Sequence, residues 1–240
     1  YLCEKYEAIF VDNGSQDATP EILQKYRDKI TILRQPKRGA AAARNTGVKQ
    51  AKYEYIAFTD SDCVPEAGWL RELALFAKDN SQADFIGGKI ISFNRNSNIE
   101  MFGEEIFNHK RAIQYYKPPF VITANLLTKK QRLFEIGLFD ESFLLGQDVD
   151  LALRGLFKHG SQFVYADKAV VRHFNSSTLK ALFLKGIKSG QAAAHIWKRY
   201  SKEFGRSLLK KCLDVFKRHK LSDEKVKFPL YNAVFDLGRR

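Results

Sequence analysis

A short apolar segment that ends in two aspartates constrains this chain more than any other feature. Residues 55–58 (Tyr-Ile-Ala-Phe) have the continuous apolar character of a buried strand, and Asp60 and Asp62 follow in a loop before a helix expected near Glu66. Two carboxylates one residue apart can hold a hard divalent cation, which can in turn hold a diphosphate. Because aspartates are also common in turns, the pair alone is a weak sign of a metal site, and its context decides the interpretation.

Predicted strands and helices alternate over the first ninety residues. We expect strands at 6–11, 30–33, 55–58 and 85–93, and helices at 18–28, 40–51 and 66–78. This order predicts an α/β fold with a mostly parallel sheet flanked by helices, a Rossmann-like arrangement that binds nucleotides. Ligands of such sheets lie beyond the carboxyl ends of the strands, where Asp17, Asp60 and Asp62 are expected.

The second half of the chain has less regular elements. We expect a strand and turn at 120–127, a short helix near 130–135, a helix that opens at residues 146–150, strands at 162–165 and 169–172, and a long helix over 177–200. Asp150 and Arg154 lie one helical turn apart, so we predict that they pair and that Asp150 is structural.

The net charge of +13 is concentrated near the carboxyl end of the chain. Between Lys180 and Lys220 there are 12 lysines and arginines against two acidic residues. We therefore divide the chain into a catalytic domain of residues 1–176 and a basic amphipathic helical extension of residues 177–240.

The extension has three interpretations: a solvated face, a surface for anionic lipids, or a nucleic-acid site. Its large apolar residues suit an anionic leaflet; they are Phe183, Trp197, Leu208, Leu209, Leu213 and Phe216. No nucleic-acid recognition motif accompanies the basic residues, so we expect no nucleic-acid partner.

Composition also bears on the compartment. No apolar run approaches the roughly 18 residues of a membrane span, and no secretory signal opens the chain. The three cysteines, Cys3, Cys63 and Cys212, are far apart and odd in number, as is typical of free thiols. We expect a cytoplasmic protein, peripheral at the inner face of the cytoplasmic membrane.

Four motifs occur in an order that resembles the inverting glycosyltransferases of family 2, which have the GT-A fold. They are residues 11–17 (VDNGSQD), Arg38-Gly39 with residues 43–45 (ARN), residues 59–62 (TDSD), and residues 146–151 (GQDVDL) with Arg154. Residues 123–125, 137–140 and 170–173 also resemble the corresponding segments of this family. The resemblance covers roughly residues 6 to 200, and the ordered set is more specific than any one member of it.

The resemblance implies transfer of a sugar, with inversion, from a nucleotide-diphosphate sugar to a glycan or lipid-linked acceptor, assisted by Mg²⁺ or Mn²⁺. For the donor, it implies that Asp17 contacts the nucleotide base, that Arg44 lies near the nucleotide, and that Asp60 lies against the ribose or diphosphate. It also implies that Asn125 lies near the donor or acceptor sugar, and that Asp62 and His173 contact the metal. Asp148 is implied to be the general base. Such a transfer needs one carboxylate to take the acceptor proton and a cation to neutralise the leaving diphosphate.

Two departures from the family pattern shape these expectations. Gln147 stands where the family usually has Glu, so no neighbouring charge raises the pKa of Asp148, and the helix N-terminus and the metal should lower it. The family also has a strand and helix before Val11, so we expect the first strand of the fold to be absent from this chain. Both departures leave a non-catalytic nucleotide-sugar-binding module as the alternative. His173 remains open as an ordinary histidine, and Cys63 is interpreted as a small buried residue.

Overall fold

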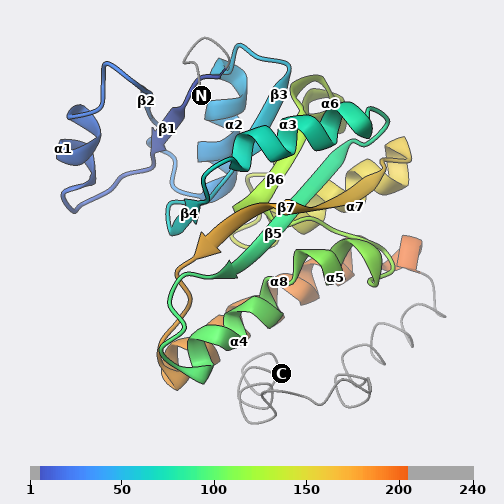
Figure 1. Ribbon diagram of the computed structural model, residues 1–240. Coiled ribbons are helices and arrows are strands. Elements are labelled where there is room, and N and C mark those ends of the chain that lie inside the picture. The colour runs from blue at the N-terminus through green and yellow to red at the C-terminus, as the bar shows by residue number, and fades with distance from the viewer. Residues whose placement is uncertain (1–5, 205–240) are drawn as a thin grey trace.

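The computed structural model describes residues 6–204 (Figure 1). Its strands are β1 (Ile9–Asp12), β2 (Thr31–Arg34), β3 (Tyr55–Phe58), β4 (Cys63–Pro65), β5 (Phe85–Ser92), β6 (Leu126–Lys129) and β7 (Phe163–His173). Its α-helices are α1 (Thr19–Gln24), α2 (Ala40–Gln50), α3 (Trp69–Asp79), α4 (Asn98–Ile106), α5 (His109–Gln114), α6 (Lys130–Ile136), α7 (Gln147–His159) and α8 (Leu179–Arg199). A 3₁₀ turn, η2 (Thr123–Asn125), precedes β6.

The strands form two sheets. The first is the parallel pair β1–β2, and the second has the order β3-β6-β5-β7-β4. In the second sheet only β5 and β7 are parallel neighbours, while β3–β6, β5–β6 and β4–β7 are antiparallel. The expectation of a mostly parallel sheet is therefore wrong in this detail. Helical crossovers make parallel neighbours, but β4 follows β3 directly after a turn, and β6 inserts against the direction of both its neighbours.

The central strand predicted from residues 55–58 is present, although it is less buried than its sequence suggests. All four residues of β3 are half-buried, whereas most residues of β5 are buried. Among the described residues β3 pairs only with β6, and β1 pairs only with β2, so no ladder joins the two sheets. The expected absence of a first strand concerns residues before β1 and stays a prediction.

One face of the larger sheet is covered by α3, which lies across β5 and β7 (Figure 1). Trp69, Leu73 and Ala77 recur every fourth residue, so they share one side of the helix. They pack with Ile86 of β5 and Val171 of β7 in one buried cluster.

The opposite face is covered by α2, α5, α6 and α7. Phe85 is fully buried there and packs in a cluster with Val48, Ile113, Leu133 and Leu151, one from each of these helices. Full burial of a side chain of this size contributes about 1.5–3 kcal/mol. The result is an α/β fold of three layers, which holds the strand ends and their loops in fixed positions.

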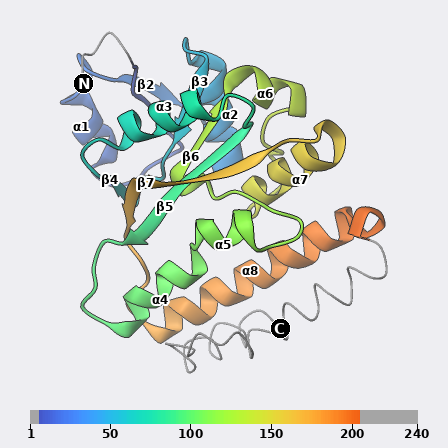
Figure 2. The same ribbon diagram turned by 45° about the vertical axis from the view of Figure 1, so that its right-hand side comes forward.

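Helix α8 runs alongside α4 and α5 (Figure 2). Its carboxyl-terminal end is attached to the domain, because Ile196 and Tyr200 pack in one cluster with Phe143 and Leu153. The boundary proposed at residue 176 stays a prediction, and the amphipathic segment predicted over 206–220 lies outside the described residues. Within residues 6–204 no helix combines the length and apolar character needed to cross a bilayer.

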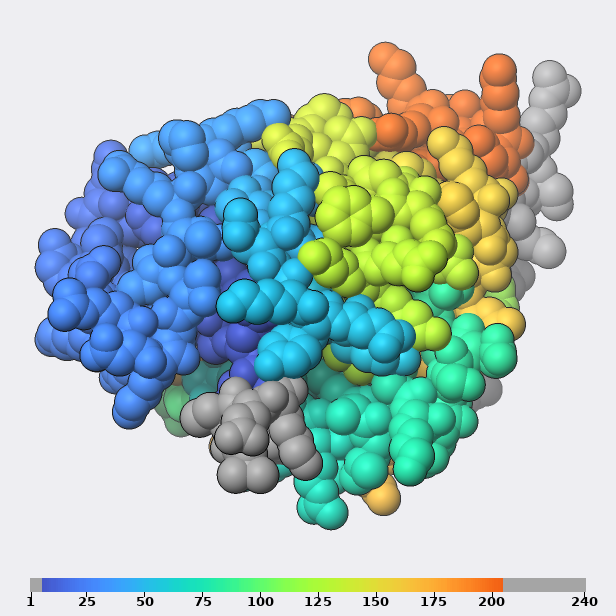
Figure 3. Space-filling model, turned by 90° about the horizontal axis from the view of Figure 1, so that it is seen from above, coloured from blue at the N-terminus to red at the C-terminus, as the bar shows by residue number. Residues whose placement is uncertain are grey.

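Figure 3 shows the molecule from above. The blue amino-terminal residues gather on one side, and the orange end of α8 lies at the far edge, beyond the yellow-green residues of α6.

Candidate active site

The loop between β3 and β4 carries Asp60, which is held by an arginine from α2. Nη2 of Arg44 lies 2.7 Å from Oδ1 of Asp60, and the two side chains are only 17% and 32% exposed. The guanidinium of Arg44 also lies over the ring of Phe139, 5.7 Å from its centroid. A partly buried charge-assisted hydrogen bond fixes both groups, so Asp60 and Arg44, predicted separately, form one unit.

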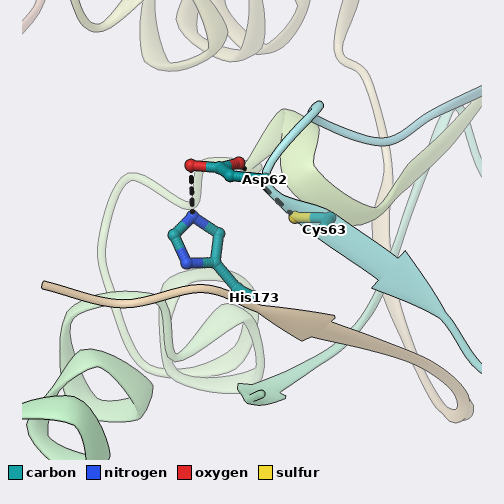
Figure 4. A group of neighbouring side chains, drawn as sticks. All are labelled: Asp62, Cys63 and His173. Atoms are coloured by element: carbon teal, nitrogen blue, oxygen red, sulfur yellow. Dashed lines mark hydrogen bonds and ion pairs between the residues drawn. The ribbon is translucent and has the colours of Figure 1, made fainter. Parts of the chain in front are cut away.

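Asp62 faces His173 on the other side of the same loop (Figure 4). The antiparallel pairing of β4 and β7 sets Cys63 opposite His173, and Nε2 of His173 lies 3.5 Å from Oδ2 of Asp62. The Asp62 side chain is 55% exposed and that of His173 only 6%. An accessible carboxylate beside an anchored imidazole fits a divalent cation such as Mn²⁺.

Cys63 completes a group of three possible metal ligands whose atoms lie within 4.8 Å of one another. Burial, with the charges of Asp60 and Asp62, raises the pKa of the Cys63 thiol to about 12. A thiol with this pKa is neutral at pH 7, and the thiolate is the form that binds metals. The cluster therefore offers Asp62 and His173, and the interpretation of Cys63 as a small packed residue agrees with its surroundings.

His173 is held in its neutral form with its outer nitrogen toward Asp62. Burial lowers its pKa, and this effect is opposed by the charge of Asp62 and by the side chain of Asn175. Nδ2 of Asn175 donates to Ser92 Oγ at 3.0 Å and to the Glu100 carbonyl at 3.1 Å. Its Oδ1 is therefore the atom that can interact with the imidazole. In the described part of the chain, His173 Nδ1 and Asn175 Oδ1 are both buried and neither has a hydrogen-bond partner. A proton on Nδ1, inferred from this environment, leaves the Nε2 lone pair free for a cation.

Asp148 is the second residue of α7, next to Arg44 and Asp60. Its Oδ1 accepts from the backbone N–H of Val149 at 2.9 Å, and its Oδ2 lies 3.4 Å from the backbone N of Thr123. Burial raises the pKa of Asp148 above its usual value, and the Arg44 charge opposes this shift. The expected lowering of this pKa is therefore not found in the protein without a bound cation, because desolvation of the half-buried side chain outweighs the Arg44 charge and the helix N-terminus.

The residues on either side of Asp148 in the motif are structural. Gln147 is buried and donates to the carbonyls of Phe143 and Leu144, which fixes the turn before α7. Asp150 is fully buried, with Arg154 Nε at 2.8 Å, as predicted. Tyr200 Oη donates to its other oxygen at 2.7 Å.

Asp17 lies in the loop between β1 and α1. It is exposed, and its Oδ1 accepts from the backbone N–H of Thr19 at 3.0 Å, which lowers its pKa. No described contact joins it to Asp60, Asp62 or Asp148, so its contact with the nucleotide base stays a prediction.

Asn125 does not face a donor or acceptor sugar. It is 0% exposed. Its Oδ1 accepts from Trp69 Nε1 at 2.9 Å, and its Nδ2 donates to the carbonyls of Lys89 and Ala169. Its hydrogen bonds are thus used in joining η2 to three other segments, and the predicted sugar contact is wrong.

Three residues near Asp62 and His173 were missed by the sequence reasoning. Asn175 supports His173, the ring of Phe107 lies 4.3 Å from the His173 ring, and Lys185 Nζ lies 4.0 Å from the centre of the Phe107 ring. The spacing of His173 and Asn175 could have pointed to Asn175, because residues two apart in an extended segment share a side. Phe107 and Lys185 come from helices whose packing the sequence does not reveal.

A family model described as "Glycosyl transferase family 2" matches residues 2–136, more than half of the chain. The chain belongs to glycosyl transferase family 2. Two curated glycosyltransferases illustrate the similarity. Glycosyltransferase AglE of Haloferax volcanii is 27% identical over 202 residues, which are 82% of this chain and 66% of AglE. Pre-mycofactocin glycosyltransferase of Mycobacterium tuberculosis is 29% identical over 204 residues, 80% of this chain and 42% of that protein. The chain thus spans less than two thirds of either relative.

Solved structures show the same fold. The mannosyltransferase PcManGT from Pyrobaculum calidifontis, in complex with GDP-Man and Mn²⁺, superposes with a TM-score of 0.66 at 16% identity, over 99% of this chain and 66% of that one. S. aureus TarS in complex with UDP-GlcNAc gives a TM-score of 0.59 at 18% identity, over 86% and 66% of the two chains. The expected GT-A-type fold is confirmed.

Proposed function

We propose that this chain transfers a sugar, with inversion, from a nucleotide-diphosphate sugar to a glycan or lipid-linked acceptor. The observation that carries the proposal is the short loop from Asp60 to Asp62. Asp60 is bonded to Arg44 and acts on the pKa of Asp148, while Asp62 faces His173. One loop thus connects a half-buried carboxylate suited to be a base with a pair suited to hold a cation.

The nucleotide-sugar donor is assigned to a site beside Arg44, Asp60 and Asp62. Asp17 would contact the nucleotide base. The structural neighbours bind UDP-GlcNAc, and GDP-Man with Mn²⁺, which supports a nucleotide sugar and a divalent cation here. Asp62 and His173 would hold Mg²⁺ or Mn²⁺, and the cation would supply positive charge to the leaving diphosphate. Arg44 orients Asp60, and Asn175 orients His173.

Asp148 is the proposed general base. The pKa raised by burial gives it a higher affinity for a proton than an exposed aspartate has, and the Arg44 charge favours its ionised form. When the acceptor hydroxyl attacks the anomeric carbon, its proton passes to Asp148 and the bond to the diphosphate oxygen breaks. One carboxylate suffices, because inversion needs no covalent sugar intermediate.

We also propose that the enzyme works at the inner face of the cytoplasmic membrane. On α8, Phe183 and Trp197 are exposed large apolar side chains, and Lys180 and Lys198 are exposed too. Apolar and basic groups together on one helix suit an anionic leaflet. A lipid-linked acceptor or a growing polysaccharide would meet the enzyme there.

The test is a screen of UDP and GDP, with and without Mn²⁺, by thermal shift, followed by donor hydrolysis. A ligand at 100 times its Kd stabilises by about 2.7 kcal/mol, which raises Tm measurably. An enzyme also releases nucleoside diphosphate slowly from UDP-GlcNAc or GDP-mannose in the presence of Mn²⁺. Binding without release would support the non-catalytic binding module instead, and no metal-dependent shift with either nucleotide would contradict both.

A further inference from the structure

Lys185 of α8 contacts the same aromatic ring as His173, one of the candidate metal ligands. Its Nζ is 4.0 Å from the centre of the Phe107 ring, and the same ring lies 4.3 Å from the ring of His173. Such a cation–π contact fixes the ammonium group in place. Together with Gly103 and Leu182, Lys185 lines a small cavity between α4 and α8.

This ammonium group has no direct counterion within residues 6–204. No carboxylate of that part lies within salt-bridge distance of Nζ, and Asp62 is the acidic group whose charge acts on Lys185. Burial lowers the pKa of Lys185 to about 8. Lys188, one turn further along α8, is exposed. A half-buried lysine without a counterion costs stability, so its position requires an explanation that a solvent-facing lysine does not.

The neighbouring pair of Asp62 and His173 would add a second positive charge near Lys185 when it holds a cation. If that pair holds a divalent cation, as proposed above, then this cation and the Lys185 ammonium group repel each other, because Lys185 is already close enough for the charge of Asp62 to act on its pKa. Two cations at close range repel each other unless an anion lies between them. A nucleoside diphosphate carries several negative charges on adjacent phosphates, so it can contact a metal ion and an ammonium group at the same time.

We propose that Lys185 binds phosphate oxygens of the nucleoside diphosphate at the Asp62–His173 site. The inference rests on the proposed function and extends it to a residue outside the family motifs. During transfer, the acceptor oxygen bonds to the anomeric carbon, the bond from that carbon to the diphosphate oxygen breaks, and its electron pair stays on the diphosphate. The acceptor proton goes to Asp148. Lys185 keeps its protons and donates a hydrogen bond to the departing group, where negative charge develops.

The experiment compares Lys185→Met, Lys185→Arg and Lys188→Met by calorimetry with UDP and GDP in the presence of Mn²⁺, on the full chain. Lys185→Met keeps most of the side-chain volume and removes the charge. We expect it to weaken diphosphate binding by about 10- to 100-fold, as the loss of one charged hydrogen bond would. Lys185→Arg should stay within a few-fold of the wild type, and Lys188→Met, the exposed control, should bind normally.

Two further measurements, of Tm and of the affinity for nucleoside monophosphates, distinguish lost phosphate binding from lost folding. Because Lys185→Met removes a partly buried charge, its Tm should not fall, so lost binding is not lost folding. The affinity for UMP and GMP should change much less than that for the diphosphates if Lys185 contacts the terminal phosphate. Equal diphosphate affinity in the wild type and Lys185→Met would overturn the inference while leaving the proposed function intact. A wild type that binds neither UDP nor GDP would overturn both.

Discussion

Arg44 and Asp60, joined by a 2.7 Å hydrogen bond, act in opposite directions on the pKa of Asp148. The Arg44 charge lowers this pKa and the Asp60 charge raises it, while burial raises it further. The acidity of the proposed base is therefore set first by burial and then by a pair from α2 and the β3–β4 loop, rather than by its neighbour Gln147 in the sequence.

The first prediction concerns Arg44→Met. Without the guanidinium, the pKa of Asp148 rises further, so the carboxylate ionises only at higher pH. In donor hydrolysis, the acidic limb of the kcat profile should move to higher pH, and kcat should recover as the pH increases. Arg38→Met, which removes a nearby exposed arginine, is the control. A drop in kcat with an unmoved acidic limb would show that Arg44 serves substrate binding and does not tune the base.

Asp62→Ala should abolish the Mn²⁺-dependent part of nucleoside diphosphate binding, since the hard cation loses its carboxylate ligand. Calorimetry with UDP and GDP, in Mn²⁺ and in EDTA, measures this part directly. Asp79→Ala removes an exposed carboxylate at the end of α3 and should leave the metal dependence unchanged. Retained metal dependence in Asp62→Ala would remove Asp62 from the site.

Asp150→Asn should cost stability rather than donor binding. Asp150 is buried between Arg154 and Tyr200, and loss of its charge leaves the arginine without its counterion. Breaking a buried pair on one side costs about 3–5 kcal/mol, toward the lower limit here because Asn retains hydrogen bonds. Urea unfolding should show a lower midpoint, whereas diphosphate affinity of the folded protein stays normal. An unchanged midpoint would contradict the structural role.

Reversal of Lys210, Lys211, Lys217 and Arg218 to Glu should release the protein from anionic vesicles. These residues lie outside the described part of the chain, and the prediction rests on their charge, at roughly 1 kcal/mol per basic residue near such a surface. The control reverses four exposed lysines of the domain: Lys25, Lys29, Lys52 and Lys78. Both variants have the same net charge. Equal co-sedimentation of the two variants would mean that the extension is a solvated face.

The sequence was sufficient for most of the order of elements and for the proximity of Asp62 and His173, although β4 was not expected and β7 was expected as two strands. Asp60 and Asp62 follow an apolar strand, and His173 ends a later one, so the rule that ligands gather at strand ends brings them together. Strand direction was harder to predict. The direction of β6 depends on how residues 93–125 return to the sheet, and no local pattern records that path.

The errors at Asn125 and Asp148 have one physical origin. Whether a polar side chain faces a ligand or the interior depends on partners far away in sequence, such as Trp69 and Ala169 for Asn125. Likewise, the desolvation of Asp148 is a property of the packed structure. Motif spacing identifies such residues, but it does not determine their burial.

The most direct test of the account is Asp148→Asn. The substitution keeps the shape of the side chain and removes its basicity, so Mn²⁺-dependent release of nucleoside diphosphate from the donor should fall by a factor on the order of 100 to 10,000. Affinity for the diphosphate should be nearly unchanged. Stability should not decrease at pH 7: burial raises the folded-state pKa, so the ionised carboxylate lowers stability as pH rises above the unfolded-state pKa, and Asn removes that loss.

The decisive measurement is therefore single-turnover donor cleavage by Asp148→Asn, with diphosphate affinity and Tm measured on the same preparation. Lost cleavage with intact binding and an equal or higher Tm is the result that the account predicts. Near-normal cleavage by this variant would contradict the assignment of Asp148 as the base.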